Sequence, residues 1–412
     1  MAGPLEGIRV VELGVWVAGP AAGGILADWG ADVVKVEPLG GDPCRLFQYI
    51  LGGDMPTNPV FDMDNRGKRS IALDLTTDDG HAVIDELLAE ADVFVTNVRL
   101  GGLDRLGLDH SSVTARHRRL VYAAVTGYGL EGDEAGSGAF DVAGFWARSG
   151  IAHLLTPDGG DPPFQRGGMG DHSTGLATAA GVCAALLARE RTGEGQVVST
   201  SLLRQGAYTI SFDLSVTLGW GLTLQIGRRD NMGNPAMNNY TAGDGRRFWL
   251  VGLEPERHWA PLTRAVGRPD WLQDERYATA RGRRHNAAGL VIELDEIFAA
   301  RPLDEWAEIF ATEPELFWAP IQSPDDLLAD PQFAAAGGLV EVPDGTSTST
   351  LVATPVDFSD TAWAPKGMAP RLGEHSDDIL RSLGRSDAEI EALAAAGVVG
   401  RDTQQLTGAV SR

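Results

Sequence analysis

Short apolar runs alternate with stretches whose apolar residues recur every three or four positions throughout the first half of the chain. The first run, residues 8–13, leads through a glycine-containing loop to a helix-like stretch at residues 21–28, and then to a second apolar run at residues 32–37. Short apolar runs bounded by turn residues are typical of buried strands. A strand, a helix and a second strand in this order predict a βαβ unit with parallel strands.

The same alternation continues to about residue 218. It predicts further strands at residues 71–75, 92–97, 120–125 and 196–201, and helices at residues 80–89, 111–118 and 202–218. Buried parallel strands with intervening helices favour the α/β class. We therefore predict a large domain with a Rossmann-like parallel sheet.

The composition changes near Gly227, where polar and turn-forming residues follow one another as they do in linkers. Two strand-like stretches then flank residues 243–245, which is a hairpin signal. Helices are predicted after the hairpin at residues 259–266, 290–300 and 304–311. These elements indicate a second, smaller domain of the α+β type.

The length of 412 residues exceeds one ordinary core. We predict a large α/β domain over residues 1–225, a small α+β domain over residues 226–340 and a C-terminal segment over residues 341–412. Within the last segment, glycine, serine and threonine at residues 345–349 predict a surface turn. Helices are expected there at residues 376–383 and 386–395.

The charge and composition exclude several classes of protein. A net charge of −23 argues against nucleic-acid binding, which requires a basic surface. Two cysteines, Cys44 and Cys183, occur without a CxxC motif, so we predict no disulfide framework and no metal site. There is no run of about 18 apolar residues and no basic segment followed by an apolar core. We therefore expect a cytoplasmic protein that does not cross a membrane.

A glycine-rich turn at residues 166–175 stands directly before a run of helix-forming residues, 176–189. Asp171 lies in this turn, at or just before the predicted helix N-terminus, where unpaired N–H groups favour negative charge. Asp171, Ser173 or Thr174 could simply cap the helix. The alternative is a chemical role for Asp171, and this stretch alone leaves both interpretations open.

Glycines and basic residues near strand ends suggest further ligand sites. Residues 127–132 match GxGxxG, but the loop-like sequence that follows does not open a helix, so the motif does not predict a dinucleotide site. The first βαβ unit also lacks this fingerprint, which disfavours a dinucleotide-dependent oxidoreductase. Lys68 and Arg69 could hold phosphate groups or form a solvated turn. Asn97 and Arg99 follow a strand, at the edge where α/β sheets bind ligands.

Short sequence blocks spread over the whole chain recur in the order and spacing of one known family. They are residues 11–13, 18–20 and 26–38, Asn65 with residues 68–70, residues 73–75, Asn97 with Arg99, Asp171 with residues 174–175, and residues 193–196, 330–332 and 372–375. The chain resembles the class III CoA-transferases of the CaiB/BaiF type. These include formyl-CoA transferases and, as related enzymes, 2-methylacyl-CoA racemases. The chain differs at Val17, where some formyl-CoA transferases carry glutamine, and at Leu100, where proline is common.

The resemblance implies that Asp171 is a nucleophile. A helix N-terminus is expected to lower the pKa of its carboxyl and keep it ionised. The positions that match the family's CoA site are Val17, Ala18, Lys68, Arg69, Asn97 and Arg99, with Arg105 as a further candidate. The candidates for the substrate pocket are Trp16, Tyr128 and Phe140, together with His172 beside the nucleophile.

The implied reaction moves CoA from an acyl-CoA thioester to a carboxylic acid through an aspartyl anhydride and an aspartyl-CoA thioester. Coenzyme A is then part of the substrates, and no tightly bound cofactor is expected. The implied assembly is an intertwined homodimer, in which the C-terminal segment returns to the large domain.

Two alternatives follow from the same resemblance. A 2-methylacyl-CoA racemase needs two proton carriers, and this chain has Phe140 where the racemases carry a histidine before the aspartate that matches Asp141. A CoA-binding protein without activity is the other alternative, and Asp171 in its glycine turn disfavours it.

Overall fold

The computed structural model describes residues 3–50, 57–223 and 226–402. The chain divides into two units. The large unit comprises residues 1–153, 163–223 and 335–412, and the small unit comprises residues 154–162 and 224–334.

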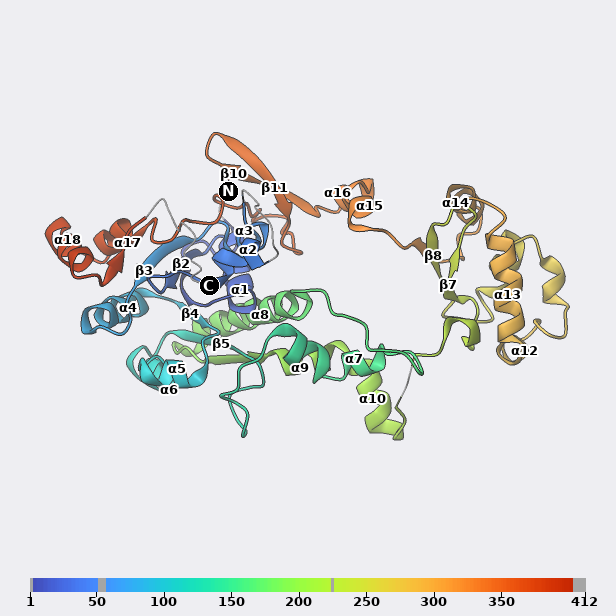
Figure 1. Ribbon diagram of the computed structural model, residues 1–412, viewed down its shortest axis with the longest axis horizontal. Helices are drawn as coiled ribbons and strands as arrows, with labels where there is room; N and C mark the ends of the chain where they lie inside the picture. Colours follow the sequence, from blue (N-terminus) through green and yellow to red (C-terminus); the bar gives the residue numbers. More distant parts are fainter. Residues whose placement is uncertain (1–2, 51–56, 224–225, 403–412) are drawn as a thin grey trace. The chain divides into compact units, whose positions relative to one another are not determined.

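A mainly parallel sheet organises the large unit (Figure 1). Within the described residues it has seven strands in the order β12-β3-β2-β1-β4-β5-β6. Strands β1 to β6 pair in parallel with their neighbours, whereas β12 pairs antiparallel with β3. The predicted α/β fold with a large parallel sheet is therefore confirmed. The strands are β1 (Arg9–Leu13), β2 (Asp32–Glu37), β3 (Arg69–Leu73), β4 (Val93–Thr96), β5 (Val121–Thr126), β6 (Val197–Ser201) and β12 (Val399–Gly400).

Helices cover both faces of this sheet, because its strands are apolar on both sides. The helices are α1 (Ala18–Asp28), α3 (Pro59–Asn65), α4 (Asp78–Glu90), α5 (Leu100–Arg105), α6 (His110–Arg116), α8 (Met169–Thr192), α17 (Ser376–Ser382) and α18 (Asp387–Ala395). Val11 and Leu13 of β1 belong to a core shared with α4, α5, α6, α17 and α18. Val10, on the opposite face of the same strand, belongs to a core shared with α1 and α8.

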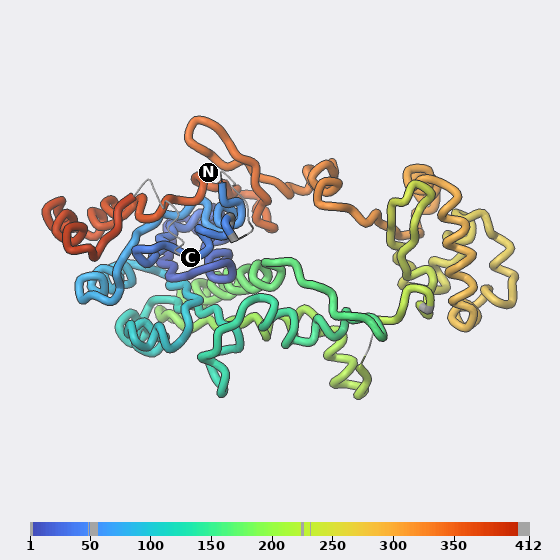
Figure 2. Tube along the Cα trace, viewed as in Figure 1, coloured from blue at the N-terminus to red at the C-terminus, as the bar shows by residue number. Residues whose placement is uncertain are grey.

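The C-terminal segment lies beside the N-terminal strands of the large unit (Figure 2). Val399 of β12 pairs with Leu73 of β3. Residues 345–349, predicted as a surface turn, instead contribute to a hairpin in which β10 (Leu339–Asp344) pairs with β11 (Ser347–Val352). The turn is shorter than predicted because alternating threonines suit a strand.

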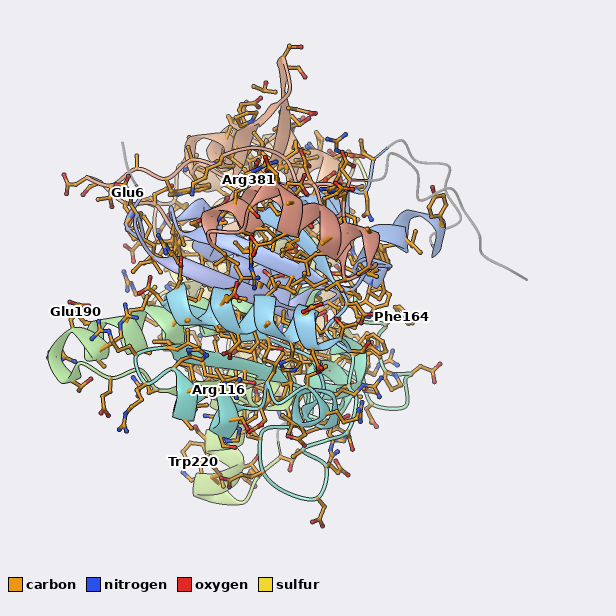
Figure 3. All side chains as sticks on the ribbon, turned by 90° about the vertical axis from the view of Figure 1, so that its left-hand side faces the viewer. Glu6, Arg116, Phe164, Glu190, Trp220 and Arg381 are labelled. Carbon is orange, nitrogen blue, oxygen red and sulfur yellow. The ribbon has the colours of Figure 1, made fainter. Side chains whose placement is uncertain are left out.

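The helix predicted at residues 202–218 is broken at Ile210 into α9 (Leu202–Thr209) and α10 (Ser211–Trp220). Helix α10 projects from the large unit (Figures 1 and 3). Its exposed large apolar side chains are Phe212, Leu218 and Trp220. Over the described ranges, the helices are too short or too polar to cross a bilayer.

The small unit is of the α+β type, with an antiparallel sheet β7-β8-β9 in its described part. The predicted hairpin is confirmed as β7 (Met237–Thr241) and β8 (Arg247–Val251). Buried aromatic residues, among them Phe248 and Phe298, form the core of this unit. Its further strand and α-helices are β9 (Trp318–Pro320), α11 (Trp259–Ala265), α12 (Ala280–His285), α13 (Ala287–Phe298), α14 (Leu303–Ala311) and α15 (Pro324–Leu328), followed by α16 (Pro331–Ala335) at its boundary with the large unit. Two further short helices are α2 (Phe47–Ile50) and α7 (Ile151–Leu154).

Candidate active site

Buried charges hold the loop that connects β1 to α1. The Glu12 carboxylate accepts hydrogen bonds from Lys35 Nζ (2.9 Å) and Lys68 Nζ (2.6 Å), and all three side chains are fully buried. Lys35 also donates to Gly14 O (3.1 Å). Lys68 also donates to Pro20 O (2.8 Å). Burial opposes the charge on Glu12, but the two ammonium groups hold its pKa below the usual value. The network therefore fixes both ends of the loop.

Within this loop, Trp16 adopts a left-handed backbone conformation with a φ of 62°. Such a conformation costs a residue other than glycine about 1–3 kcal/mol, so the surroundings must enforce it. Asp42 Oδ1 accepts the Trp16 N–H (3.0 Å), and Asp42 Oδ2 lies 3.0 Å from Lys35 Nζ. The Asn97 amide accepts from Val15 N (2.9 Å) and donates to Val15 O (2.7 Å). Side chains from two other segments thus hold the loop in one conformation.

Helix α8 begins at a tightly packed turn. A Cβ on Gly170 would lie 2.2 Å from Phe145 Cγ and 2.3 Å from Asp141 Oδ1, so only glycine fits there. The Asp141 carboxylate accepts the Gly170 N–H (3.1 and 3.2 Å) and the Gln165 amide N–H (2.6 Å). The capping role considered for Asp171 is therefore filled by Asp141, which comes from a different segment.

Asp171 lies in the first turn of α8 and is partly buried. Burial, followed by repulsion from Asp141, raises the pKa of its carboxyl to about 7, while His172 opposes this rise. The expectation that the helix end lowers this pKa is wrong, because burial and the charge of Asp141, which binds the Gly170 N–H at that helix end, outweigh it. Among the described residues, no hydrogen bond engages the Asp171 carboxylate. It is therefore free to react, and about half of it is ionised near neutral pH.

His172 pairs with a carboxylate on the other side of the helix start. Its Nε2 lies 3.1 Å from Asp64 Oδ1, and this hydrogen bond raises the pKa of the imidazole. Both side chains line a cavity of about 210 Å³ that also contains Met63 and Leu176. The Asp64–His172 pair is thus adjacent to Asp171 in sequence but borders a different cavity.

A larger cavity, of about 930 Å³, lies past the carboxyl ends of β1, β4 and β5, where α/β sheets bind ligands. Asp171 is the only carboxylate among the described residues that line it. The predicted site residues that line this cavity are Trp16, Val17, Ala18, Asn97, Arg99, Arg105, Phe140 and Asp171. The predicted site residues that do not line it are Lys68, Arg69, Tyr128 and His172.

The residues outside the cavity have other partners. Lys68 is buried, and burial lowers the pKa of its ammonium to about 8 although Glu12 opposes this. Arg69 forms a two-pronged ion pair with Asp32 (2.9 and 2.6 Å). The Tyr128 ring lies 4.7 Å from the guanidinium carbon of Arg148. The CoA contacts expected for Lys68 and Arg69 therefore have no support in this geometry.

Arg99 and Arg105 are the cations that line the cavity in the described part of the chain. Neither forms an ion pair with a described carboxylate, although the chain has 57 acidic residues against 34 basic ones. A planar guanidinium without a protein partner suits a phosphate group. These two side chains are the candidates for the phosphates of CoA.

Three residues at the site were not predicted from the sequence. Asp141 and Gln165 hold the start of α8, and Asp64 pairs with a histidine 108 positions away. No local motif marks such contacts, because their partners are distant in sequence. For Glu12 and Lys35 the sequence does give an indication, because each is a charged residue within an apolar strand, and such a charge is rarely buried without a partner.

Comparison with known proteins settles the family. The model of CoA-transferase family III matches residues 5–376. The chain belongs to this family. Its relatives include the (R)-2-hydroxy-4-methylpentanoate CoA-transferase of Clostridioides difficile, which is 32% identical over 402 residues, covering 96% of this chain and 99% of the relative. The succinate–glutarate CoA-transferase of Agrobacterium fabrum is 33% identical over 401 residues, covering 92% and 96%. A CAIB/BAIF family protein from Brucella suis has the same fold in its crystal structure, with a TM-score of 0.82, 30% identity and coverage of 93% and 100%.

Membership of CoA-transferase family III makes this chain an acyl-CoA:carboxylate CoA-transferase. The family and the enzyme class predicted from the sequence are confirmed. The relatives do not favour the racemase alternative. In the described ranges, no group of three or more histidine, cysteine, aspartate or glutamate side chains is placed to hold a metal ion.

Proposed function

We propose that this family III CoA-transferase works through a covalent intermediate on Asp171. The observation that carries the proposal is that Asp171 is the only carboxylate among the described residues of a cavity that also holds Arg99 and Arg105. The carboxylate can attack a thioester carbonyl, and the arginines can bind the CoA phosphates. With a pKa of about 7, the Asp171 carboxylate is more basic than an exposed aspartate, and about half of it is ionised at neutral pH.

The cycle begins when an Asp171 oxygen attacks the thioester carbonyl carbon. The C–S bond breaks, its electron pair leaves with the CoA thiolate, and a mixed anhydride forms between the acyl group and Asp171. The thiolate then attacks the side-chain carbonyl carbon of Asp171, which releases the donor acid as a carboxylate and leaves an aspartyl-CoA thioester. The acceptor carboxylate runs the two steps in reverse and regenerates Asp171. Each step exchanges a carboxylate and a thiolate, so the cycle balances without net transfer of protons or electrons.

The remaining cavity residues have supporting roles in this proposal. Arg99 and Arg105 bind phosphate groups of CoA. Val17 and Ala18 border the thioester, and Asn97 positions their loop through its paired hydrogen bonds to Val15.

The composition of the cavity favours transfer over racemisation. Exchange of an α-proton between two faces requires two proton carriers. The described lining contains Asp171 but no histidine, lysine or second carboxylate, and Phe140 cannot carry a proton. His172 borders the other cavity and is paired with Asp64.

We also propose that two copies of the chain form the intertwined homodimer implied by the family resemblance. The exposed apolar side chains of α10, Phe212, Leu218 and Trp220, support an interface of this kind. Light scattering on the purified protein tests the proposal: a monomer at micromolar concentration contradicts it.

An isotope-exchange assay tests the transfer chemistry without knowledge of the natural acid pair. The enzyme is incubated with an acyl-CoA and the deuterated form of the same acid, and mass spectrometry measures the deuterated thioester. Wild type is expected to form it without ATP, and Asp171→Asn is expected to lose at least about a thousandfold in rate. Asp79→Asn is the matched control, because Asp79 also lies in the first turn of a helix, α4, and is exposed outside the cavity. Exchange that persists in Asp171→Asn contradicts the proposal.

A further inference from the structure

Trp16 and Phe140 form an aromatic pair at the cavity. Their ring centroids are 6.0 Å apart, and the rings meet edge to face at 82°. Both residues line the cavity of about 930 Å³, yet Phe140 is 67% exposed. An aromatic side chain usually buries most of its surface, so this ring lacks the cover that an apolar ligand would supply.

The position of Trp16 is enforced by the protein. Its left-handed backbone would relax in an unrestrained loop, but its N–H is bound by Asp42 Oδ1 and the preceding residue is bound by Asn97. Strained residues held in this way gather at ligand sites. Here the restrained backbone keeps the indole against Phe140 at the cavity.

The pair lies close to the nucleophile, because the neighbours of both residues touch the start of α8. Asp141, which follows Phe140, accepts the N–H of Gly170, directly before Asp171. A Cβ on Gly175, one turn further along α8, would lie 3.2 Å from Ala18 O at the start of α1, two residues after Trp16. The acyl group of a thioester whose carbonyl reaches Asp171 is therefore within reach of both rings.

The charges of the cavity disfavour a second carboxylate on that acyl group. The described cations of the lining are Arg99 and Arg105, which the proposed function assigns to the CoA phosphates. A dicarboxylic acyl group would place its free carboxylate beside two aromatic rings and the carboxylate of Asp171. An unpaired charge in such a place is unfavourable.

Resting on the proposed function, we propose that Trp16 and Phe140 bind the acyl group of the thioester and select acids with an aryl or branched alkyl chain. This assigns a substrate class to the site, in preference to short acids and dicarboxylic acids. Edge-to-face packing of an aryl ring and apolar burial of a branched chain both supply the selectivity.

The isotope-exchange assay tests this selectivity with four acids: acetate, succinate, 4-methylpentanoate and 3-phenylpropanoate. Wild-type kcat/KM is expected to be at least about tenfold higher with the last two thioesters than with acetyl-CoA or succinyl-CoA. Trp16→Ala is expected to lower the ratio of 3-phenylpropanoyl-CoA to acetyl-CoA about tenfold or more, and Phe140→Leu several-fold. Phe317→Leu, at an exposed phenylalanine of the small unit that does not line the cavity, should leave the ratio unchanged.

The outcomes separate this inference from the proposed function. The proposed acyl site at Trp16 and Phe140 is wrong if exchange is fastest with acetate or succinate. It is also wrong if the ratio of kcat/KM for 3-phenylpropanoyl-CoA to that for acetyl-CoA is unchanged in both Trp16→Ala and Phe140→Leu. Neither result contradicts the proposed chemistry on Asp171. No exchange by the wild type with any of the four acids contradicts the proposed function itself. A circular-dichroism melt of each variant verifies folding, and the two independent variants keep the test decisive if one of them fails to fold.

Discussion

Replacing Asp141 with asparagine should shift the pH dependence of CoA transfer to lower pH. Asp141 is the charged neighbour that contributes most, after burial, to the raised pKa of Asp171. The amide keeps the size of the side chain, and its oxygen can still accept the Gly170 N–H. Gln165 can adapt, because its buried Oε1 has no partner in the described structure and can accept from the new amide. The change therefore removes a charge with little change of packing.

The magnitude follows from the ionisation of Asp171. Its pKa of about 7 lies about three units above the usual 3.8, and a neighbouring like charge typically accounts for about one unit or more of such a rise. With a pKa of about 7, roughly a tenth of the nucleophile is ionised at pH 6, whereas with a pKa of about 6 roughly half of it is. Asp141→Asn should therefore exceed the wild type about fivefold in kcat/KM at pH 6, if the ionised form alone reacts.

The assay is the pH profile of kcat/KM for thioester exchange between pH 5 and 9, with folding checked at each pH. Asp64→Asn serves as the control. It removes a weaker repulsion that raises the pKa of Asp171, but it also lowers the pKa of His172, whose positive charge lowers the pKa of Asp171. The two effects oppose each other. The midpoint of Asp64→Asn should move less than that of Asp141→Asn. An unchanged or higher midpoint in Asp141→Asn refutes the reasoning.

Three further predictions follow from other parts of the site. Asp171→Asn should raise the free energy of unfolding at pH 8 by at most about 4 kcal/mol, for a shift of three pKa units, and should change it little at pH 4. The reason is that the folded pKa of about 7 exceeds the usual 3.8, so the wild type loses stability as the pH rises from about 4 to about 7. Thermal melts at several pH values measure the difference. Lys68→Met should lower the free energy of unfolding by about 3–5 kcal/mol, because it leaves the buried carboxylate of Glu12 with one partner. A raised KM for acyl-CoA with an unchanged free energy of unfolding would instead mean that Lys68 binds CoA. Arg99→Ala and Arg105→Ala should each raise that KM about tenfold or more at low salt and less at high salt, as steady-state kinetics can show; a KM insensitive to both changes removes these arginines from the phosphate site.

Most of the large sheet was predictable, because a buried parallel strand is a short apolar run and needs little else to be recognised. The strand predicted at residues 71–75 is β3 at Arg69–Leu73, a difference of two residues. The break at Ile210 was not predictable, because no glycine or proline marks it and the helical pattern continues on both sides. The hairpin at residues 339–352 was missed because serine, threonine and glycine occur in turns and in exposed strands alike.

The candidate site was predictable from the sequence only where the residues next to a side chain in the chain indicate its role. Asp171 stands out through its glycines and the helix that follows. The role of Lys68 could not be predicted, because its partner Glu12 lies 56 positions earlier in the chain. Whether its ammonium binds a phosphate or a carboxylate depends on burial, which the local sequence does not indicate. The raised pKa of Asp171 could not be predicted either, because it depends on burial and on the charge of Asp141, which is 29 positions before its hydrogen-bond partner in α8.

Peptide mass spectrometry of the enzyme under turnover tests the covalent role of Asp171 most directly. Wild-type protein and Asp171→Ala are incubated with a panel of acyl-CoA thioesters and quenched with borohydride, which reduces an aspartyl-CoA thioester to an alcohol, or with hydroxylamine, which converts it to a hydroxamate. We predict modification of the peptide containing Asp171 in the wild type and none in the variant. No modification with any thioester, together with entry of solvent deuterium at the α-carbon of a 2-methylacyl-CoA, would contradict the transferase mechanism on Asp171 and support proton exchange instead.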